Sequence, residues 1–168
     1  MTTAQVQQQF QALVEEHKKI LYKVCHSYAR NAVDREDLAQ EIVVQLWRSF
    51  PSFDSQYRFA TWMYRVALNV AISFLRREHT RSTHIVAGDE RLLEVPEPYD
   101  EPAEAVSMLR MFIETLQPLD RGLMLLYLDE YGYAEIARIM GITETNVATK
   151  ISRLKKALKT KFLQADLA

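Results

Sequence analysis

Apolar residues recur along most of the chain at steps of three and four positions, which is the spacing of one face of an α-helix. Three such faces lie in the first half of the sequence. The first comprises Val6, Phe10, Leu13, His17, Leu21, Val24 and Tyr28. The second lies between an expected N-cap at Asp34 and the helix-ending Pro51, and comprises Leu38, Ile42, Leu46 and Phe50. The third ends at the basic pair Arg76 and Arg77, and comprises Trp62, Val66, Val70 and Phe74.

Periodicity is absent from about Arg81 to Ala103, where the chain contains Gly88 and three prolines. Residues 81–104 carry 2 basic and 7 acidic side chains, whereas residues 1–80 carry 10 and 8 and residues 105–168 carry 9 and 7. Such a segment cannot bury enough apolar surface to fold alone. We therefore expect two helical modules, 1–80 and 105–168, joined by a flexible acidic linker at 81–104.

Four further helical patterns follow this segment, the last of them long. The first ends before Pro118 and comprises Val106, Leu109, Phe112 and Leu116. The second is expected to be capped by Asp120, and comprises Leu123, Met124 and Tyr127. The third runs from about Ala134 to Met140; the last is capped by Thr143 and comprises Val147, Ile151, Leu154, Leu158 and Phe162. Because helix formers dominate and β-branched runs between turn signals are missing, the predicted fold class is all-α, with two small helical domains.

Residues 133–154, YAEIARIMGITETNVATKISRL, have the spacing of a helix-turn-helix motif. Ala137 is small where two helices approach closely, Gly141 can take the positive φ of a sharp turn, and Val147 can pack the second helix on the first. A plain antiparallel helix pair with a glycine turn would give a similar pattern. In the DNA-reading interpretation, the second helix enters a major groove with side chains from its first turns. These are Glu144, Thr145, Asn146, Thr149, Lys150 and Arg153.

Two features of the first module carry further chemistry. Residues 34–47, DREDLAQEIVVQLW, place Asp37, Gln40, Glu41 and Gln45 along one exposed ridge, although many amphipathic helices have such a ridge. Residues 59–77, FATWMYRVALNVAISFLRR, interleave aromatic, arginine and asparagine side chains. Such a segment suits binding of single-stranded nucleic acid, because rings stack on bases and arginines contact phosphates. The alternative is that the six aromatics between residues 50 and 64 form part of the hydrophobic core.

These segments together resemble the extracytoplasmic-function group of the sigma-70-type sigma factors. Residues 34–47 resemble their region 2.2, residues 59–77 their regions 2.3 and 2.4, and residues 116–158 their region 4. The resemblance covers residues from about 10 to 162 apart from the linker. It implies a protein that binds core RNA polymerase and directs promoter-specific initiation. The family's large third region is absent, in keeping with a chain of 168 residues.

The resemblance also implies roles for individual residues. Asp37, Gln40, Glu41 and Gln45 would grip the clamp coiled coil of the largest polymerase subunit, and the second module would contact the flap. The residues around a pocket for a flipped −10 base would be Phe53, Tyr64, Val66 and Asn69, with Arg65, Arg76 and Arg77 on strand phosphates. The helix-turn-helix would read −35 duplex DNA. Many relatives carry Lys or Arg where this chain has Ala148, which could instead touch a thymine methyl group. An anti-sigma factor is a further candidate partner.

Several other classes of protein are disfavoured by the sequence. It contains no GxxxxGK, HExxH or CxxC motif, so we expect no enzyme activity, cofactor or metal. Cys25 is the single cysteine and excludes an internal disulfide. No stretch approaches the roughly 20 apolar residues of a membrane span, and the N-terminus lacks the features of a signal peptide, so a cytoplasmic location is expected.

Two rival functions remain open at this point. A one-component helix-turn-helix regulator would bind a palindromic duplex without polymerase. A polymerase-binding inhibitor or adaptor would lack promoter specificity. The ridge at residues 37–45 and the aromatic-basic third helix favour the sigma factor over the first rival, and the intact recognition helix favours it over the second.

Overall fold

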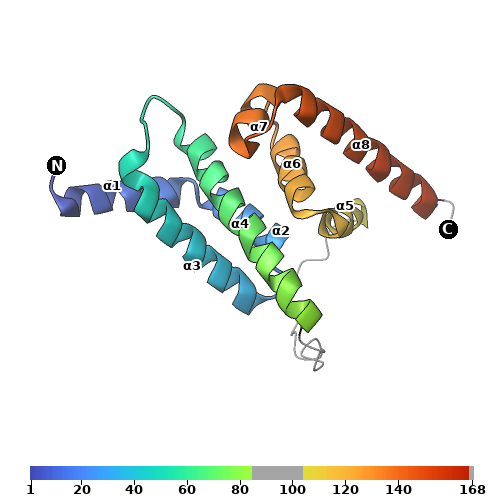
Figure 1. Cartoon of the computed structure of the whole chain (residues 1–168), viewed down its shortest axis with the longest axis horizontal. Helices are drawn as coiled ribbons and strands as arrows, with labels where there is room; N and C mark the ends of the chain where they lie inside the picture. Colours follow the sequence, from blue (N-terminus) through green and yellow to red (C-terminus); the bar gives the residue numbers. More distant parts are fainter. Residues whose placement is uncertain (85–103, 167–168) are drawn as a thin grey trace. The chain divides into compact units, whose positions relative to one another are not determined.

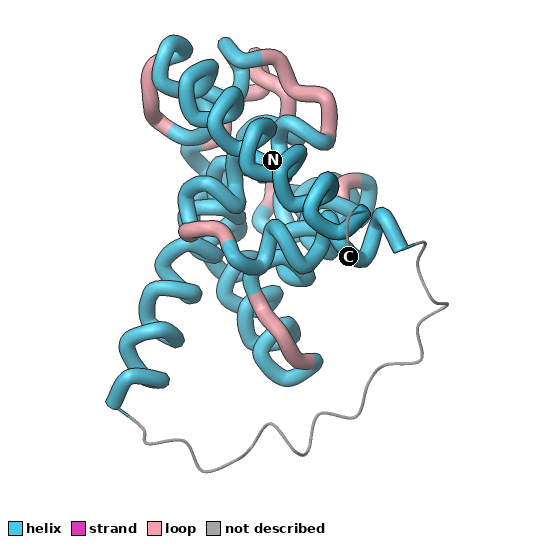
Figure 2. The backbone as a smooth tube through the Cα atoms, turned by 90° about the vertical axis from the view of Figure 1, so that its right-hand side faces the viewer, coloured by secondary structure: helices cyan, strands magenta, loops and turns pink. Residues whose placement is uncertain are grey.

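The structure, a computed structural model, describes residues 1–84 and 104–166, and over these residues it contains eight α-helices, one 3-10 turn and no strand (Figure 2). The all-α prediction is therefore confirmed. The chain divides into two compact units, Met1–Phe74 and Leu75–Ala168. The linker expected at residues 81–104 lies mostly outside the described residues. Among the helices that are described, none is long and apolar enough to cross a membrane.

The first unit contains α1 (Thr3–Glu16), α2 (Lys18–Tyr28), α3 (Ala32–Ser49), the 3-10 turn η1 (Phe50–Ser52) and the beginning of α4 (Phe59–His84). Helix α2 packs against α3, and Figure 1 draws α4 alongside α3 and in front of α2. The core includes Val24, Leu38, Ile42 and Leu46, which are fully buried. The apolar face predicted for α3 is therefore confirmed.

The first predicted helix is in fact two helices, which meet at His17. The backbone of His17 has φ −108° and ψ 19°, outside the helical range, and its Nδ1 atom lies 2.9 Å from the carbonyl oxygen of Leu13. Its ring lies 5.1 Å from the ring of Phe59, so the side chain turns inward. The sequence pattern missed the break because His17 occupies a position in the apolar repeat.

The start of α3 also differs from its prediction. Asn31, three residues before Asp34, is the N-cap, and its side-chain oxygen accepts a hydrogen bond of 2.8 Å from the backbone N–H of Asp34. Asp34 stands in the first helical turn, where a carboxylate is favourable to the helix dipole. The prediction of Asp34 as the cap was therefore wrong by one helical turn.

Helix α4 buries a different face from the one predicted. Of the predicted face, Trp62, Val66 and Val70 are only partly buried, whereas Phe74 is buried as predicted. The fully or almost fully buried positions lie one or two residues later in each turn, and they are Met63, Tyr64, Ala67, Leu68 and Ala71. The helix also continues past Arg76 and Arg77 to His84.

The second unit contains α5 (Glu104–Thr115), α6 (Pro118–Leu128), α7 (Tyr133–Met140) and α8 (Glu144–Asp166). Helix α6 contacts the other three, and α7 and α8 contact each other. The buried residues of this unit include Phe112, Leu123, Met124, Leu126, Ile136, Ile139, Val147 and Ile151. The predicted cap at Asp120 was wrong, because α6 begins with Pro118 after Gln117 and Asp120 stands in its first turn.

Arg121 ties α5 to α6. It is the one buried charged side chain in the described part of the chain, with 8% of its surface exposed. Its Nη2 donates to the carbonyl oxygens of Glu114 and Leu116 at 2.7 and 3.3 Å. Glu114 lies in the last turn of α5 and Leu116 directly after the helix, where carbonyl oxygens have no partner within the helix, so Arg121 fixes the end of α5.

Candidate nucleic-acid interface

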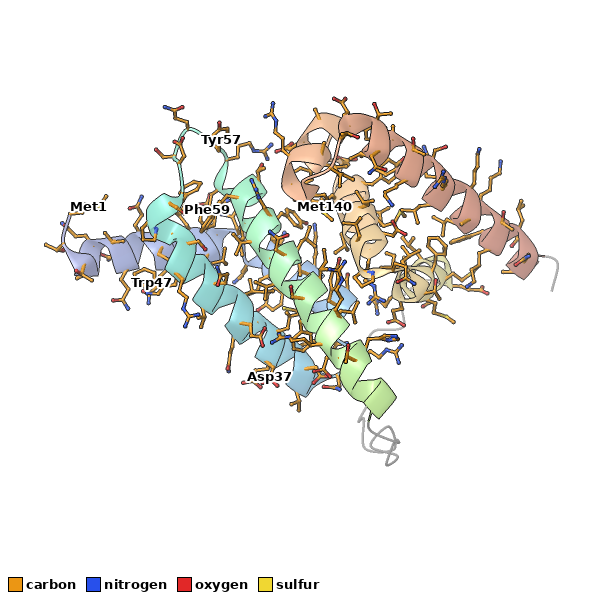
Figure 3. All side chains as sticks on the ribbon, viewed as in Figure 1. Met1, Asp37, Trp47, Tyr57, Phe59 and Met140 are labelled. Carbon is orange, nitrogen blue, oxygen red and sulfur yellow. The ribbon has the colours of Figure 1, made fainter. Side chains whose placement is uncertain are left out.

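The polar ridge of α3 is present as predicted. Asp37, Gln40, Glu41 and Gln45 are all exposed, on the side opposite the buried apolar face. Figure 3 shows Asp37 near the start of α3 and Trp47 near its other end. Val44, at the step i+4 from Gln40, is 47% exposed, so the ridge contains an apolar position that a search for polar residues missed.

Most of the predicted aromatic segment forms a cluster inside the first unit. Phe53 in the loop after η1 lies 6.1 Å from Phe50, 5.5 Å from Phe59 and 5.1 Å from Trp62, measured between ring centroids. Phe10 of α1 joins the cluster through Phe50, at 5.2 Å. Phe53 therefore stands half-buried in the wall of the cluster, where its ring is held by its neighbours.

Tyr57 is the exception among these aromatics. It lies in the loop between η1 and α4, on the outside of the unit, with 63% of its surface exposed (Figure 3). The neighbouring Arg58 is also exposed. An exposed ring beside an arginine suits an unpaired base, and the residue was not among the predicted site residues although its type and position were visible in the sequence.

The exposed line of α4 contains Arg65, Asn69, Arg76 and Arg77. Arg65 and Asn69 are one turn apart, and Arg76 follows two turns later on nearly the same side of the helix. Val66 beside them is half-buried. Tyr64 has no exposed surface at all, so it cannot contact a base in this conformation, and its expected position around the −10 pocket is corrected to a position in the core.

The turn between α7 and α8 has the predicted helix-turn-helix geometry. Gly141 is left-handed, with φ 70° and ψ 31°, and its N–H donates to the carbonyl of Ala137 at 2.9 Å. Thr143 caps α8, because its Oγ1 accepts from the backbone N–H of Asn146 at 3.1 Å. Val147 is fully buried, as the packing of α8 on α7 requires. The predicted glycine turn and cap are confirmed.

The first turns of α8 present most of the predicted contact residues to solvent. Glu144, Thr145, Asn146, Thr149 and Arg153 are exposed, and Ala148 is half-buried. Thr149 donates its hydroxyl to the carbonyl oxygen of Thr145 at 3.0 Å. These side chains form one continuous exposed surface on the N-terminal half of α8.

Lys150 differs from its neighbours on α8. It is half-buried, and its Nζ lies 3.9 Å from Oδ1 of Asp120 on α6. One turn and a half later, Lys155 stands over the ring of Tyr127, 5.3 Å from the centroid. Both lysines thus face α6.

Reactive chemistry in residues 1–84 and 104–166 could come from the Cys25 thiol or from a cluster of metal ligands. Burial raises the pKa of the Cys25 thiol to about 11, against which the charge of Arg35 acts only weakly. The thiol is therefore protonated at neutral pH and a poor nucleophile. No cluster of three or more His, Cys, Asp or Glu that could hold a metal is found among the described residues.

Comparison with known families matches the two units separately. The profile described as Sigma-70 region 2 matches residues 13–81, and that described as Sigma-70, region 4 matches residues 107–158. The ECF RNA polymerase sigma factor SigW of Bacillus subtilis is 30% identical over 165 residues, covering 91% of this chain and 88% of that protein.

Two solved structures share the fold, each with a TM-score of 0.67. One is the sigma factor RpoE in complex with the anti-sigma factor NepR from Bartonella quintana, 18% identical and covering 88% of this chain and 94% of that one. The other is CnrH in complex with the cytosolic domain of CnrY, 22% identical and covering 97% of this chain and 95% of that one. Both conserved regions, in the same order, are therefore present: the chain belongs to the extracytoplasmic-function (ECF) sigma factors of the sigma-70 family, which direct RNA polymerase to promoters and are not themselves enzymes.

Proposed function

We propose that the chain divides promoter recognition between its two units, and that each exposed surface described above has one partner. The first unit, together with the rest of α4, captures the opened −10 element and holds core polymerase; α8 of the second unit reads −35 duplex DNA. The observation that carries this division is that the polar and basic contact residues form two separate sets, one on α3 and α4 and one on α8.

The proposed −10 surface is the exposed line of α4 together with the loop before it. Asn69 can both donate to and accept from a base edge, which makes it the best candidate for reading an extruded base. Phe53 would form the wall of the pocket and Val66 its edge, while Arg65, Arg76 and Arg77 would contact strand phosphates. Tyr57 is added to this set because its ring is exposed. Flipping a base costs a few kcal/mol, which stacking on such a ring can offset.

The proposed −35 surface is the N-terminal half of α8. Glu144, Thr145, Asn146 and Thr149 would meet base edges or the nearest phosphates, and Ala148 a thymine methyl group. Arg153 is the best-placed cation for duplex DNA, since it is exposed and lies on this surface. Lys150 contributes only where DNA displaces its pairing with Asp120.

The proposed polymerase surface is the α3 ridge of Asp37, Gln40, Glu41 and Gln45, with Val44 in its middle. The ridge supports binding to the clamp coiled coil because it combines acidic and amide groups with an exposed apolar side chain. The flap is the proposed partner of the second unit. Since polymerase acts on the chromosome, the proposed compartment is the cytoplasm.

An anti-sigma factor is proposed as a regulatory partner. RpoE and CnrH, which share the fold, were each solved in complex with a second protein, the anti-sigma factor NepR and the cytosolic domain of CnrY.

The test of the proposed function is run-off transcription from a genomic library with core polymerase and the purified chain. We expect transcripts whose upstream sequences share two short boxes at a fixed spacing, and none with core polymerase alone. Tight binding to a palindromic duplex without polymerase, with no new transcripts, would contradict the proposal and favour a one-component regulator.

A further inference from the structure

Helix α2 has an exposed face that the functions above do not use. Its buried side consists of Ile20, Val24, Cys25 and Tyr28. The opposite side carries five exposed residues, which we name the α2 basic face: Lys18, Lys19, Tyr22, Lys23 and His26. At 3.6 residues per turn, they span an arc of about 140°, with Tyr22 between the lysines.

Charge is strongly segregated between α2 and the helix it packs against. Residues 17–30 contain four Lys or Arg and no Asp or Glu, whereas residues 31–48 contain two basic and four acidic residues. Glu15 pairs with one residue of this face: its Oε1 lies 2.7 Å from Nζ of Lys18. Both members of that pair are more than half exposed, so the pairing holds Lys18 only weakly in water. The α2 basic face is therefore complementary to a polyanion.

Stability of the helix does not account for this pattern. Lys18 and Lys19 stand in the first turn of α2, where the helix dipole favours acidic side chains. Tyr22 is 58% exposed, so packing of its ring in the core does not explain its presence here. His26 is exposed as well, and its Nδ1 lies 2.8 Å from the carbonyl oxygen of Tyr22 one turn before it.

The exposed ring decides which polyanion fits best. A DNA duplex keeps its bases stacked on each other and offers a ring only phosphates and groove edges. A single strand offers unstacked bases, which bind to aromatic side chains while flanking lysines meet the phosphates. The arrangement of one ring between three lysines matches the second case.

We propose that the α2 basic face is an additional contact surface for single-stranded promoter DNA, with Tyr22 stacking on an unpaired base and Lys19 and Lys23 holding phosphates beside it. The inference rests on the proposed −10 function, since the strand is available only after the promoter opens. It extends the strand-binding surface beyond α4 and the loop before it. Because stacking and phosphate contacts tolerate any sequence, this surface contributes affinity without adding base specificity.

The experiment uses holoenzyme assembled from core polymerase and the full chain. The probe is a fluorescent single-stranded oligonucleotide carrying the −10 strand of a promoter obtained by run-off transcription, without −35 duplex. Tyr22→Ala should weaken binding about tenfold, as expected for one lost base stack, and Tyr22→Phe should bind like the wild type. Lys19→Ala/Lys23→Ala should reduce the slope of log affinity against log salt by about 1.4, since each single-strand phosphate contact contributes about 0.7.

Three controls separate the possible outcomes. Lys159→Ala/Lys161→Ala on α8 removes the same charge from exposed positions of the other unit and should leave binding of this probe unchanged. Asn69→Ala reports on the proposed −10 site itself, and core-polymerase binding is measured for every variant.

If Asn69→Ala weakens binding but the α2 variants bind like the wild type, the inference is overturned and the proposed function stands. If the α2 variants lose core polymerase but not the strand, the face is a polymerase contact and the inference is again overturned. If wild-type holoenzyme does not bind the strand, both the inference and the proposed −10 function fail.

Discussion

Replacing Gly141 by alanine tests the geometry of the helix-turn-helix in isolation from its contacts. A Cβ atom at this position would meet no atom within 4 Å, so the substitution introduces no clash. The penalty is conformational: a residue with a side chain loses about 1–2 kcal/mol in the left-handed region that Gly141 occupies at φ 70°. Alanine also restricts the unfolded chain more than glycine does, and this offsets the destabilisation by about 0.4–1 kcal/mol. We expect a net loss of about 1 kcal/mol in the free energy of unfolding of the second unit.

Gly132 provides a matched control for this substitution. A Cβ there also meets nothing within 4 Å, but φ is −70°, which any residue can adopt. Alanine is a poorer N-cap than glycine for α7, and this small loss roughly offsets the entropic gain, so Gly132→Ala should leave stability nearly unchanged.

Urea denaturation can measure the effect on one unit at a time. Both tryptophans, Trp47 and Trp62, lie in the first unit, so tryptophan fluorescence follows that unit, while helical circular dichroism follows both. With a slope near 1 kcal/mol/M, Gly141→Ala should move the circular dichroism midpoint of the second unit down by about 1 M and leave the fluorescence transition in place. Equal effects of the two glycine substitutions, or a shift of the fluorescence transition, would refute the reasoning.

Three further predictions concern other positions. Arg121→Met should destabilise the second unit by about 2–3 kcal/mol in the same denaturation assay, because it removes charged hydrogen bonds to the end of α5; an unchanged midpoint would show that those bonds are dispensable. Cys25 of the native protein should react with iodoacetamide at pH 8 far more slowly than Cys25 of the protein unfolded in urea, and rapid alkylation of the native protein would contradict this. The free energy of unfolding should fall as pH rises from about 9 to about 11, because the thiol ionises first in the unfolded chain while burial holds its folded pKa at about 11. Cys25→Ala should remove this contribution to the pH dependence. Gln40→Ala/Glu41→Ala should weaken pull-down of core polymerase with little change in melting temperature. The control Gln9→Ala/Glu16→Ala, at exposed positions of α1, should leave the pull-down unchanged. Equal pull-down by both variants would show that the ridge is not part of the polymerase interface.

Features set by neighbouring residues were predictable from the sequence. The turn at Gly141 and the cap at Thr143 depend on residues within one or two turns, and both were found where the pattern put them. The same holds for the exposed ridge of α3, because its apolar face of Leu38, Ile42 and Leu46 is unambiguous.

Features set by packing were not predictable. In α4 almost every position from Trp62 to Phe74 except Arg65, Asn69 and Ser73 is apolar, so periodicity cannot choose between two overlapping faces, and the pattern selected the half-exposed one. Tyr64 was expected at the −10 pocket because of the family resemblance, and a motif match does not report which side of the helix is buried. The approach of Lys150 to Asp120, 30 residues earlier in the chain, depends on how α8 packs against α6.

The central claim, that one unit opens and captures the −10 element and the other reads −35 duplex, is tested most directly by comparing Asn69→Ala with Arg153→Ala in holoenzyme. On one promoter, permanganate footprinting measures strand opening and salt-titrated binding to a −35 duplex measures duplex affinity. We predict that Asn69→Ala reduces opening without changing duplex affinity. Arg153→Ala should weaken duplex binding by about 1–3 kcal/mol if it meets a base edge, or weaken all sequences alike and flatten the salt slope if it meets a phosphate. The same loss of duplex binding in both variants, with opening unaffected by Asn69→Ala, would contradict the account.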